Sequence, residues 1–275
     1  MFIRTLEDVR GTDRYKVLLN GALYCARYLV AADGMGFSLH NNRSKPCPPM
    51  TLWYKNHWEA NYIISGVINV TDLTTQQAWK LGPGDLYQVG PNDRHYFEVV
   101  EEEHHLSIFC PALTGNETHD ADGSYSQSGP VPETDQRMFL RRIDEMRAAG
   151  KEIVTANGQA RVVRALTKSD GLGLSFSDVN FTAGASTVLW YKHHWKTSYI
   201  LSGTGLVEDL NTGESWKLEA DIAYNVGPKD RHRLSAHTDL HLVSVFCPPL
   251  EGNEQHDADG TLEPNGLVPP GPPGY

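Results

Sequence analysis

The sequence lacks the features that would suggest a membrane, a nucleic-acid partner or export. No apolar run approaches the ~18 residues that a transmembrane helix needs. Acidic residues (34) outnumber basic ones (24), the formal net charge is −10, and no basic patch stands out. The first residues, 1–4, carry a charge at once and lack the apolar core of a signal peptide. We therefore expect no membrane partner, no nucleic-acid partner and a cytoplasmic location.

Cysteine is also scarce. The four cysteines, at positions 25, 47, 110 and 247, form neither a C-x-x-C pair nor a dense framework. Small secreted domains that depend on disulfides carry many closely spaced cysteines. Reduced thiols in a cytoplasm are therefore the simplest interpretation. Hydrophobic residues make up 40% of the 275 residues, which is enough to build cores for two domains of ordinary size.

An internal repeat is the dominant feature of the chain. Residues 1–125 match residues 138–262 without a gap at an offset of about 137, with about 40% of the positions identical. For example, Trp-Tyr-Lys-Asn-His-Trp at 53–58 returns as Trp-Tyr-Lys-His-His-Trp at 190–195. A repeat of this length is a whole domain and not a solenoid unit. We predict two domains at these boundaries, joined by a linker (126–137) and followed by a Pro/Gly-rich tail (263–275).

The pattern within each copy is typical of β-structure. Short β-branched and aromatic segments alternate with Gly, Pro and Asp turns, which favours a sandwich or a barrel. The clearest strands in the first copy are 61–70, 79–81, 86–89 and 105–110. Only short helices are expected. Thr5 to Asp8 resembles a capping box at the start of one helix, and 141–149 is its counterpart in the second copy.

Two motifs resemble the signatures of cupin barrels. Glu59 is followed seven residues later by Gly66 at a hairpin, and Pro83-Gly84-Asp85 leads through a short strand to a Pro-containing turn that ends in His95. The resemblance implies an all-β fold of two tandem cupin barrels, each a double-stranded β-helix or jelly roll. Most cupins place two metal-binding histidines just before the glutamate, where this chain has Trp53 and Lys55. The usual set of three histidines and one glutamate is therefore absent.

A reduced metal set remains in the first copy. Glu59, Tyr87 and His95 offer a carboxylate, a phenolate and an imidazole, which can hold an iron-like or zinc-like divalent cation and leave positions open for substrate. Neighbouring strands of a barrel would point all three inward if their alternation agrees. The alternative interpretation is that Tyr87 belongs to the core and His95 to a structural turn.

The first copy resembles the ectoine synthase family over nearly its whole length. The resemblance lies chiefly in the Tyr-Lys-Asn-His-Trp-Glu-Ala run at 54–60 and in the Leu-Thr-Gly-x-Glu-x-His-Asp-x-Asp-Gly run at 113–123. It implies a small iron-dependent cupin enzyme, usually a head-to-tail dimer. The implied reaction closes N-γ-acetyl-2,4-diaminobutyrate to a cyclic amidine with loss of water. The implied cofactor is Fe²⁺, with Zn²⁺ or another divalent metal as alternatives.

The resemblance also implies residue roles. Positions that match Glu59, Tyr87 and His95 hold the metal in the family. The positions that line the family's reaction pocket match four residues predicted as catalytic here: Tyr54, His57, Glu117 and His119. Ring closure needs a group that removes a proton from the amine and one that protonates the leaving oxygen. Glu117 and His57 are the candidates for these roles, and the sequence does not assign which does which.

The predicted substrate-binding set contains two departures from the family. Arg27 is expected to clamp a substrate carboxylate through bidentate hydrogen bonds, the alternative being an ordinary surface salt bridge. Leu23 replaces a tryptophan and Asn42 replaces a threonine at positions that lie near the substrate in the family. Trp53 and Phe109 complete the set. The two replacements leave a related amide or amino acid as an alternative substrate.

The second copy departs further. Lys196 stands in the place of Glu59 and, when protonated, has no lone pair for a metal. Ser177 replaces His40, whereas Tyr224 and His232 are retained. We expect a barrel that keeps its fold and binds metal poorly or not at all. It is either a degenerate partner of the first barrel or a site in which the lysine ammonium acts where the metal would sit.

Three functions are compatible with these patterns. The first is an ectoine synthase-like, metal-dependent cyclising hydro-lyase. The second is an iron-dependent cupin oxygenase acting on a small amino-acid-like substrate, and the third is a non-catalytic bicupin that binds a small molecule. All three predict a small-molecule partner. The paired barrels predict a monomer with an internal pseudo-dimer, or a homodimer.

Overall fold

The structure is a computed structural model that describes residues 1–18, 21–155 and 157–275. It contains two compact units, here called the first and second barrels. The first barrel comprises Glu7–Asp144 with Pro272–Gly274, and the second comprises Met1–Leu6, Glu145–Gly271 and Tyr275. The units thus differ from the predicted repeat boundaries, because the start of the chain joins the second barrel and the linker joins the first.

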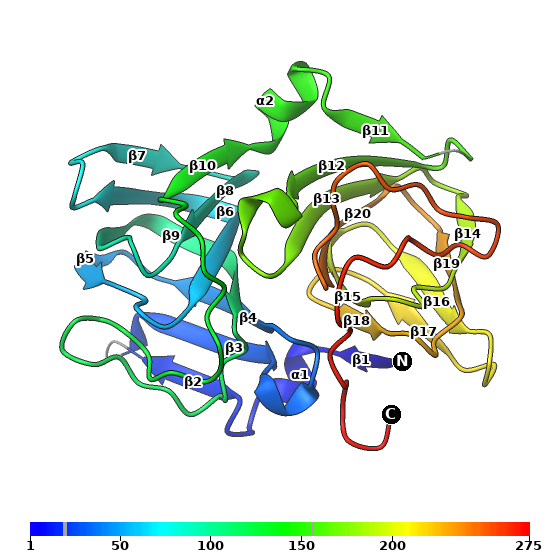
Figure 1. The fold of residues 1–275 in the computed structure, drawn as a ribbon, viewed down its shortest axis with the longest axis horizontal. Coiled ribbons are helices and arrows are strands. Elements are labelled where there is room, and N and C mark those ends of the chain that lie inside the picture. The colour runs from blue at the N-terminus through cyan, green and yellow to red at the C-terminus, as the bar shows by residue number, and fades with distance from the viewer. Residues whose placement is uncertain (19–20, 156) are drawn as a thin grey trace. The chain divides into compact units, whose positions relative to one another are not determined.

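The first barrel is one nine-stranded antiparallel sheet (Figure 1). Its main order is β10-β8-β6-β9-β4-β3-β2, with β5 paired to β9 and β7 paired to β6. Its strands are β2 (Tyr15–Leu18), β3 (Leu23–Leu29), β4 (Ser38–Ser44), β5 (Cys47–Leu52), β6 (Trp58–Asp72), β7 (Ala78–Leu81), β8 (Asp85–Val89), β9 (His95–Cys110) and β10 (Phe139–Arg142). The helical turns near it are α1 (Leu6–Val9) and η2 (Ala31–Asp33).

Two long strands close the first barrel. β6 and β9 pair from Trp58 with Cys110 to Asp72 with His95, and the register shifts on both sides of Gly66. Gly66 has φ +81°, and a Cβ at this position would lie 2.3 Å from the carbonyl oxygen of Glu102. Only glycine fits this bulge, which lets the paired strands bend sharply enough to serve both faces of the barrel.

The second barrel repeats this plan with broken strands. Its two sheets have the orders β1-β18-β15-β20-β13-β12-β11 and β14-β19-β16-β17. Its strands are β1 (Phe2–Arg4), β11 (Glu152–Val154), β12 (Ala160–Leu166), β13 (Ser175–Phe181), β14 (Ser186–Leu189), β15 (Trp195–Ser202), β16 (Gly205–Asp209), β17 (Ser215–Leu218), β18 (Ala223–Val226), β19 (His232–Ala236) and β20 (Leu240–Cys247). Its helical turns are α2 (Ile143–Ala148) and η3 (Lys168–Asp170).

The first strand of each repeat joins the sheet built from the other repeat. β1 pairs with β18 from Phe2 opposite Asn225 to Arg4 opposite Ala223. β10 pairs with β8 from Phe139 opposite Gln88. This exchange explains why the compact units and the sequence repeats have different boundaries.

The expected local elements are found. The predicted strands lie within β6, β7, β8 and β9, and the two expected helices are α1 and α2. Residues 126–137 and the tail contain no helix or strand. All four cysteines lie among the described residues and form no disulfide. In the described part of the chain, no helix is long and apolar enough to cross a membrane.

Candidate functional site

A cavity of about 230 Å³ lies inside the first barrel. Most of the residues predicted to bind substrate, catalyse or hold metal contribute to its wall. The predicted residues that line it are Leu23, Arg27, Asn42, Tyr54, Glu59, Tyr87, Phe109, Glu117 and His119. The remaining predicted residues, Trp53, His57 and His95, are buried or half-buried but are not among its lining residues.

The three candidate metal ligands come from three neighbouring strands. Glu59 lies at the start of β6, Tyr87 in β8 and His95 at the start of β9. Glu59, Tyr87 and His95 are 5%, 2% and 0% exposed, respectively. His95 shares the inward face of β9 with Phe97, which lines the cavity two residues further on. The sequence alone did not decide whether strand alternation would point all three side chains inward. In the structure, all three point to the interior of the barrel.

His95 has a nitrogen available for a ligand bond. Its Nδ1 lies 3.2 Å from the carbonyl oxygen of Asp93, whereas its Nε2 is buried and has no hydrogen-bond partner. Burial lowers the pKa of His95 to about 4, so the ring is neutral near pH 7. A neutral ring that donates from Nδ1 leaves a lone pair on Nε2, which is how metal-bound histidines are usually held.

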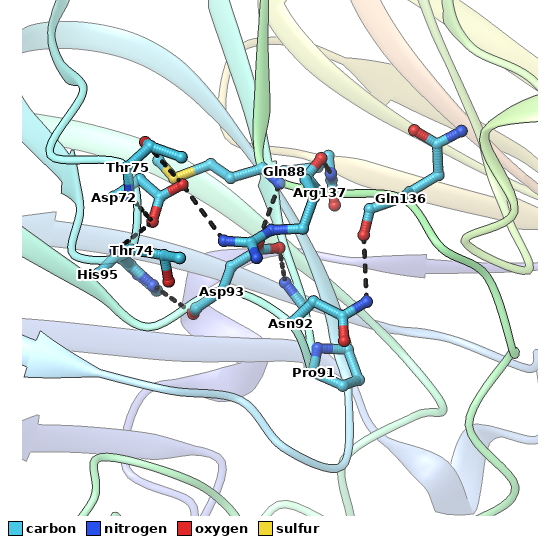
Figure 2. A network of polar contacts seen from close by, with 12 residues as sticks. Asp72, Thr74, Thr75, Gln88, Pro91, Asn92, Asp93, His95, Gln136 and Arg137 are labelled. Carbon is cyan, nitrogen blue, oxygen red and sulfur yellow. Dashed lines mark hydrogen bonds and ion pairs between the residues drawn. The ribbon is translucent and has the colours of Figure 1, made fainter.

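A polar network from the linker fixes the turn that carries His95 (Figure 2). Arg137 donates from Nε to Asp93 at 2.9 Å and from Nη2 to Asp72 at 3.3 Å. The second oxygen of Asp93 accepts from the backbone N–H of Gly90 at 3.0 Å, which closes the turn. The linker thus positions His95 indirectly, a function that the sequence did not suggest.

Glu59 lies in an environment that suits a cation. Burial raises the pKa of Glu59 to about 7, although hydrogen bonds from Asn61 and Ser107 and the charge of His105 act in the opposite direction. A nearby cation would stabilise the carboxylate form. Across residues 1–18, 21–155 and 157–275, no three His, Cys, Asp or Glu side chains gather in a way that could hold a metal. A three-ligand set here therefore requires the hydroxyl of Tyr87.

A buried series of hydrogen-bonded side chains lies beside Glu59 and was not predicted from the sequence. Glu103 accepts from His105 Nδ1 at 2.7 Å, and the Nε2 of His105 lies 3.1 Å from the Asn42 amide. Asn42 also donates to Ser107 at 3.0 Å, and Ser107 donates to Asn61 at 2.6 Å. Burial disfavours a charged His105, but Glu103 outweighs it and raises the pKa of His105. Comparison of the two repeats could have identified these residues, because Leu240 and Leu242 of the second repeat match Glu103 and His105.

Tyr54 and His119 form a second polar pair in the wall. The Tyr54 hydroxyl lies 3.3 Å from His119 Nε2, and the ring of His119 stacks on Tyr125 at 4.4 Å. Burial lowers the pKa of His119 to about 4 and raises the pKa of Tyr54 well above its usual value. The phenol is therefore protonated and the imidazole neutral near pH 7.

Arg27 is a buried cation with free donors. It is 3% exposed, which rules out the surface salt bridge considered above. Its Nη2 donates to the carbonyl oxygen of Glu117 at 3.3 Å, while its Nε and Nη1 are buried without a partner. The carboxylate of Glu117 accepts instead from the backbone N–H groups of Thr114 at 2.5 Å and Gly115 at 2.8 Å. Although burial opposes it, these hydrogen bonds lower the pKa of Glu117.

His57 and Trp53 lie outside the cavity wall. The Nε2 of His57 is 2.8 Å from Ser128 in the linker, and its ring packs edge-on against Phe109. Burial lowers the pKa of His57 to about 4. Trp53 donates from Nε1 to the carbonyl oxygen of Pro91 at 2.8 Å, at the turn before His95. Both side chains hold the surroundings of the cavity in place.

The second barrel encloses a related cavity of about 270 Å³. Lys196 occupies the place of Glu59, and its Nζ lies 3.4 Å from the hydroxyls of both Tyr191 and Tyr224. Arg164, the counterpart of Arg27, donates to the carboxylate of Glu254 at 3.1 Å and to its carbonyl oxygen at 2.7 Å. Arg164 thus pairs with a carboxylate, whereas Arg27 donates only to the carbonyl oxygen of the matching residue, Glu117.

Comparison with known proteins gives a consistent match to one family. A family model described as ectoine synthase matches residues 1–129 and 138–265. The chain is similar to an L-ectoine synthase of Oceanobacillus iheyensis, with 37% identity over 126 residues, 46% of this chain and 96% of the relative. It is also similar to that of Halomonas elongata, with 36% identity over 140 residues, 51% of this chain and 100% of the relative.

Solved structures match the two barrels together. Oxalate decarboxylase from Bacillus subtilis at pH 4.6 gives a TM-score of 0.66 at 15% identity, covering 91% of this chain and 77% of that one. A structure of the same enzyme described through its Mn(II) centres gives 0.65 at 15% identity, covering 90% and 78%. At this identity the likeness concerns the fold alone. It confirms the predicted fold class, two tandem cupin barrels.

Proposed function

The chain belongs to the ectoine synthase family, and we propose that its first barrel is a cyclising hydro-lyase. The proposed reaction is the intramolecular condensation of N-γ-acetyl-2,4-diaminobutyrate, or a related amide, to a cyclic amidine with loss of water. The observation that carries the proposal is the trio of buried candidate ligands. Glu59 and Tyr87 lie in the cavity wall, and the Nε2 of His95 has no partner among the described residues.

Glu59, Tyr87 and His95 would hold a divalent metal, for which Fe²⁺ is our first candidate. The donor set fits, because it combines a buried carboxylate, a phenol and a neutral imidazole with an unused lone pair. When bound, the metal would supply Lewis-acid polarisation of the amide carbonyl. The hydrogen bond from His95 Nδ1 to Asp93 keeps the ring in the required tautomer.

Arg27 would bind the substrate carboxylate. Its Nε and Nη1 are buried without a partner among the described residues and are charged donors for a carboxylate oxygen. The third nitrogen is held by the Glu117 carbonyl oxygen, which fixes the plane of the group. Anchoring the carboxylate in this way would leave the amine and the amide of the substrate to meet in the rest of the cavity.

Tyr54 and His119 would move the protons. In the first step a C–N bond forms between the amine and the carbonyl carbon, the amine loses a proton and the carbonyl oxygen gains one. In the second step the C–O bond breaks, the hydroxyl takes up a second proton and leaves as water, and a nitrogen loses a proton as the C=N bond of the amidine forms. The neutral His119 imidazole can accept the amine proton, and the protonated Tyr54 phenol can donate to the oxygen. The charge of Asp120 would stabilise the protonated His119, whereas the charge of Glu117 acts on His57.

Two residues of the cavity wall, Asn42 and Leu23, favour a relative of the family substrate as the alternative substrate. Asn42 takes part in the polar chain from Glu103 to Asn61, so it cannot be exchanged for a small hydroxyl without leaving His105 and Ser107 short of a partner. Leu23 adds an apolar group at another point of the same wall. Both differences reshape the pocket while preserving the ligands and Arg27.

The proposal is tested by turnover under anaerobic conditions. Iron-loaded protein is incubated with N-γ-acetyl-2,4-diaminobutyrate, and the product is identified by its mass. We expect a product lighter by one water molecule, and none from Glu59→Gln, a variant that keeps the shape of the side chain. Turnover that requires and consumes O₂ would contradict the proposal and favour an oxygenase. Binding without turnover in any metal form would favour a binding protein.

We also propose that the chain works as a monomer, since it already contains two barrels. Sedimentation velocity measures this directly. A sedimentation coefficient that corresponds to one chain at micromolar concentration is expected, and an obligate dimer of chains would contradict the proposal.

A further inference from the structure

The cavity of the second barrel has kept its shape but changed its charge. It is lined by the counterparts of the first barrel's pocket, which include Arg164, Tyr191, Phe246, Glu254 and His256. Lys196 enters it from β15 at the place that Glu59 has in β6. A carboxylate is thus replaced by an amine at the centre of an otherwise similar pocket.

Lys196 is buried and has no acidic partner. It is 4% exposed, and within the described part of the chain its hydrogen bonds go to the hydroxyls of Tyr191 and Tyr224. Its Nζ also lies 5.0 Å from the ring centre of Tyr191 and 5.6 Å from those of Tyr224 and Phe246. Among the ion pairs of the described chain, none involves this lysine. The aromatic rings attract an ammonium, but they do not neutralise it.

The charged groups around Lys196 do not compensate it either. The ionisable side chains that share the cavity or act on the lysine are Arg164, Tyr191, Tyr224, His232, Glu254, His256 and Asp257. Two of them are acids. Asp257 is exposed and accepts from the N–H groups of residues 259 and 261. Glu254 is engaged by Arg164 at 3.1 Å, by Asn265 at 2.6 Å and by the N–H groups of residues 251 and 252. Lys196 is therefore left as an unmatched basic group.

An unmatched buried amine reduces the stability of a fold, since it loses its hydration without gaining a counter-ion. An apolar residue of similar length would fill the same space at no such cost. Local choices that oppose stability are expected where a function depends on them. Lys196 also faces a cavity of about 270 Å³ and not a packed core, so a ligand has room to reach it.

We propose that the second barrel is a metal-free binding site for a small carboxylate-bearing molecule, whose anionic group pairs with Lys196. The phenol groups of Tyr191 and Tyr224 would donate to the same carboxylate or orient the ammonium, and the aromatic walls would cover the apolar part of the ligand. This inference does not depend on the reaction proposed for the first barrel.

A carboxylate explains the site better than a metal or a neutral ligand. A divalent cation would be repelled by a protonated Lys196 and would gain no ligand from it. A neutral ligand would leave the lysine as unmatched as before. Burial lowers the pKa of Lys196 to about 7. A bound carboxylate would favour the ammonium form, so binding above pH 7 should take up a proton.

The test is a calorimetric titration of metal-free full-length protein with N-acetylglycine, a small carboxylate. Because Arg27 offers a second carboxylate site in the first barrel, the comparison is made between Arg27→Met and the double variant Arg27→Met/Lys196→Met. Methionine keeps the length of lysine and removes its charge. N-acetylglycinamide, in which an amide replaces the carboxylate, is the matched control ligand.

We expect Arg27→Met to bind one N-acetylglycine per chain and the double variant to bind it roughly tenfold or more weakly. The amide should bind no better to one protein than to the other. At pH 8, titrations in buffers of different ionisation enthalpy should reveal proton uptake by Arg27→Met alone. Equal affinity of the two proteins, or no binding to Arg27→Met at millimolar concentration, overturns the proposal. Matching thermal melts show that the double variant is folded.

Discussion

The two barrels share a chain trace and differ in the inner wall that faces their cavities. Where the first barrel has Glu59, the second has Lys196. Beside these residues, the buried pair Glu103 and His105 corresponds to the apolar pair Leu240 and Leu242. These changes adjoin one another in the wall, because the charge of His105 acts on Glu59. One barrel has a wall suited to a cation, and the other has a cationic wall.

The surrounding network changes together with this patch. Asn42 links His105 to Ser107 in the first barrel, whereas Val179 stands at its position in the second. Only the last link of the polar chain remains there, as a 3.0 Å contact between Ser198 and Ser244. A buried polar network is stabilising when every member has a partner, so its members are expected to be lost together.

The largest effect is expected when the first barrel receives the lysine of the second barrel. Glu59→Lys should remove the metal and lower turnover by roughly a thousandfold, because the loss of Lewis-acid stabilisation is worth several kcal/mol. The second barrel shows that this position tolerates lysine, so the protein should fold. Turnover and bound metal are measured together. Wild-type turnover in this variant would show that Glu59 is not a ligand.

The next effect concerns the buried ion pair. His105→Leu alone should lower the free energy of unfolding by about 3–5 kcal/mol, because Glu103 would remain buried without its partner. Glu103→Leu/His105→Leu copies Leu240 and Leu242 and should recover most of that loss.

Urea titrations of the wild type and of both variants measure this difference. A double variant no more stable than His105→Leu would contradict the idea that the pair is exchanged as a unit.

The third prediction runs in the opposite direction. Lys196→Met should raise the stability of the second barrel by roughly 1–3 kcal/mol at pH 7, since it removes an unmatched buried amine. The pKa of about 7 in the folded protein lies below the ordinary lysine pKa of 10.5. The penalty is therefore fully present below pH 7 and fades as the pH rises toward 10.5.

Thermal melts of wild type and Lys196→Met across this pH range are the measurement. The stability advantage of the variant should shrink at high pH. An advantage that does not vary with pH would show that Lys196 is not desolvated in the folded protein.

The smallest predicted effect concerns the aromatic stack in the first barrel. Tyr125→Leu copies Leu262 of the second barrel and removes the ring that stacks on His119. Such a contact is worth about 0.5–1.5 kcal/mol. We expect turnover to fall by roughly twofold to tenfold, with unchanged metal content. A loss as large as that of Glu59→Lys would mean that Tyr125 takes part in the chemistry itself.

The fold could be predicted because the repeat and the turn motifs are local signals. β9 shows where such signals fail. Only residues 105–110 were expected to be strand, whereas β9 begins at His95. The acidic run 101–103 continues the strand, with Glu101 and Glu102 exposed and Glu103 buried. Pairing with β6, which lies far away in sequence, decides the matter.

The parts of the site that a sequence motif marks could be predicted. The parts that are brought together by strand pairing between distant segments could not. Glu59, Tyr87 and Arg27 reach the cavity from positions that motifs or strand patterns identified. His105 reaches it from a charged segment that carries no motif. The support of Arg137 for the His95 turn depends on the path of the linker, which composition does not encode.

The metal content of the protein measures the difference between the two barrels. Metal-free chain is loaded with Fe²⁺ under anaerobic conditions, freed of excess metal and analysed for iron per chain, beside Glu59→Ala. The asymmetry between the barrels predicts one iron per chain in the wild type and none in the variant. Two irons per chain in the wild type, or full retention of iron in Glu59→Ala, would contradict it.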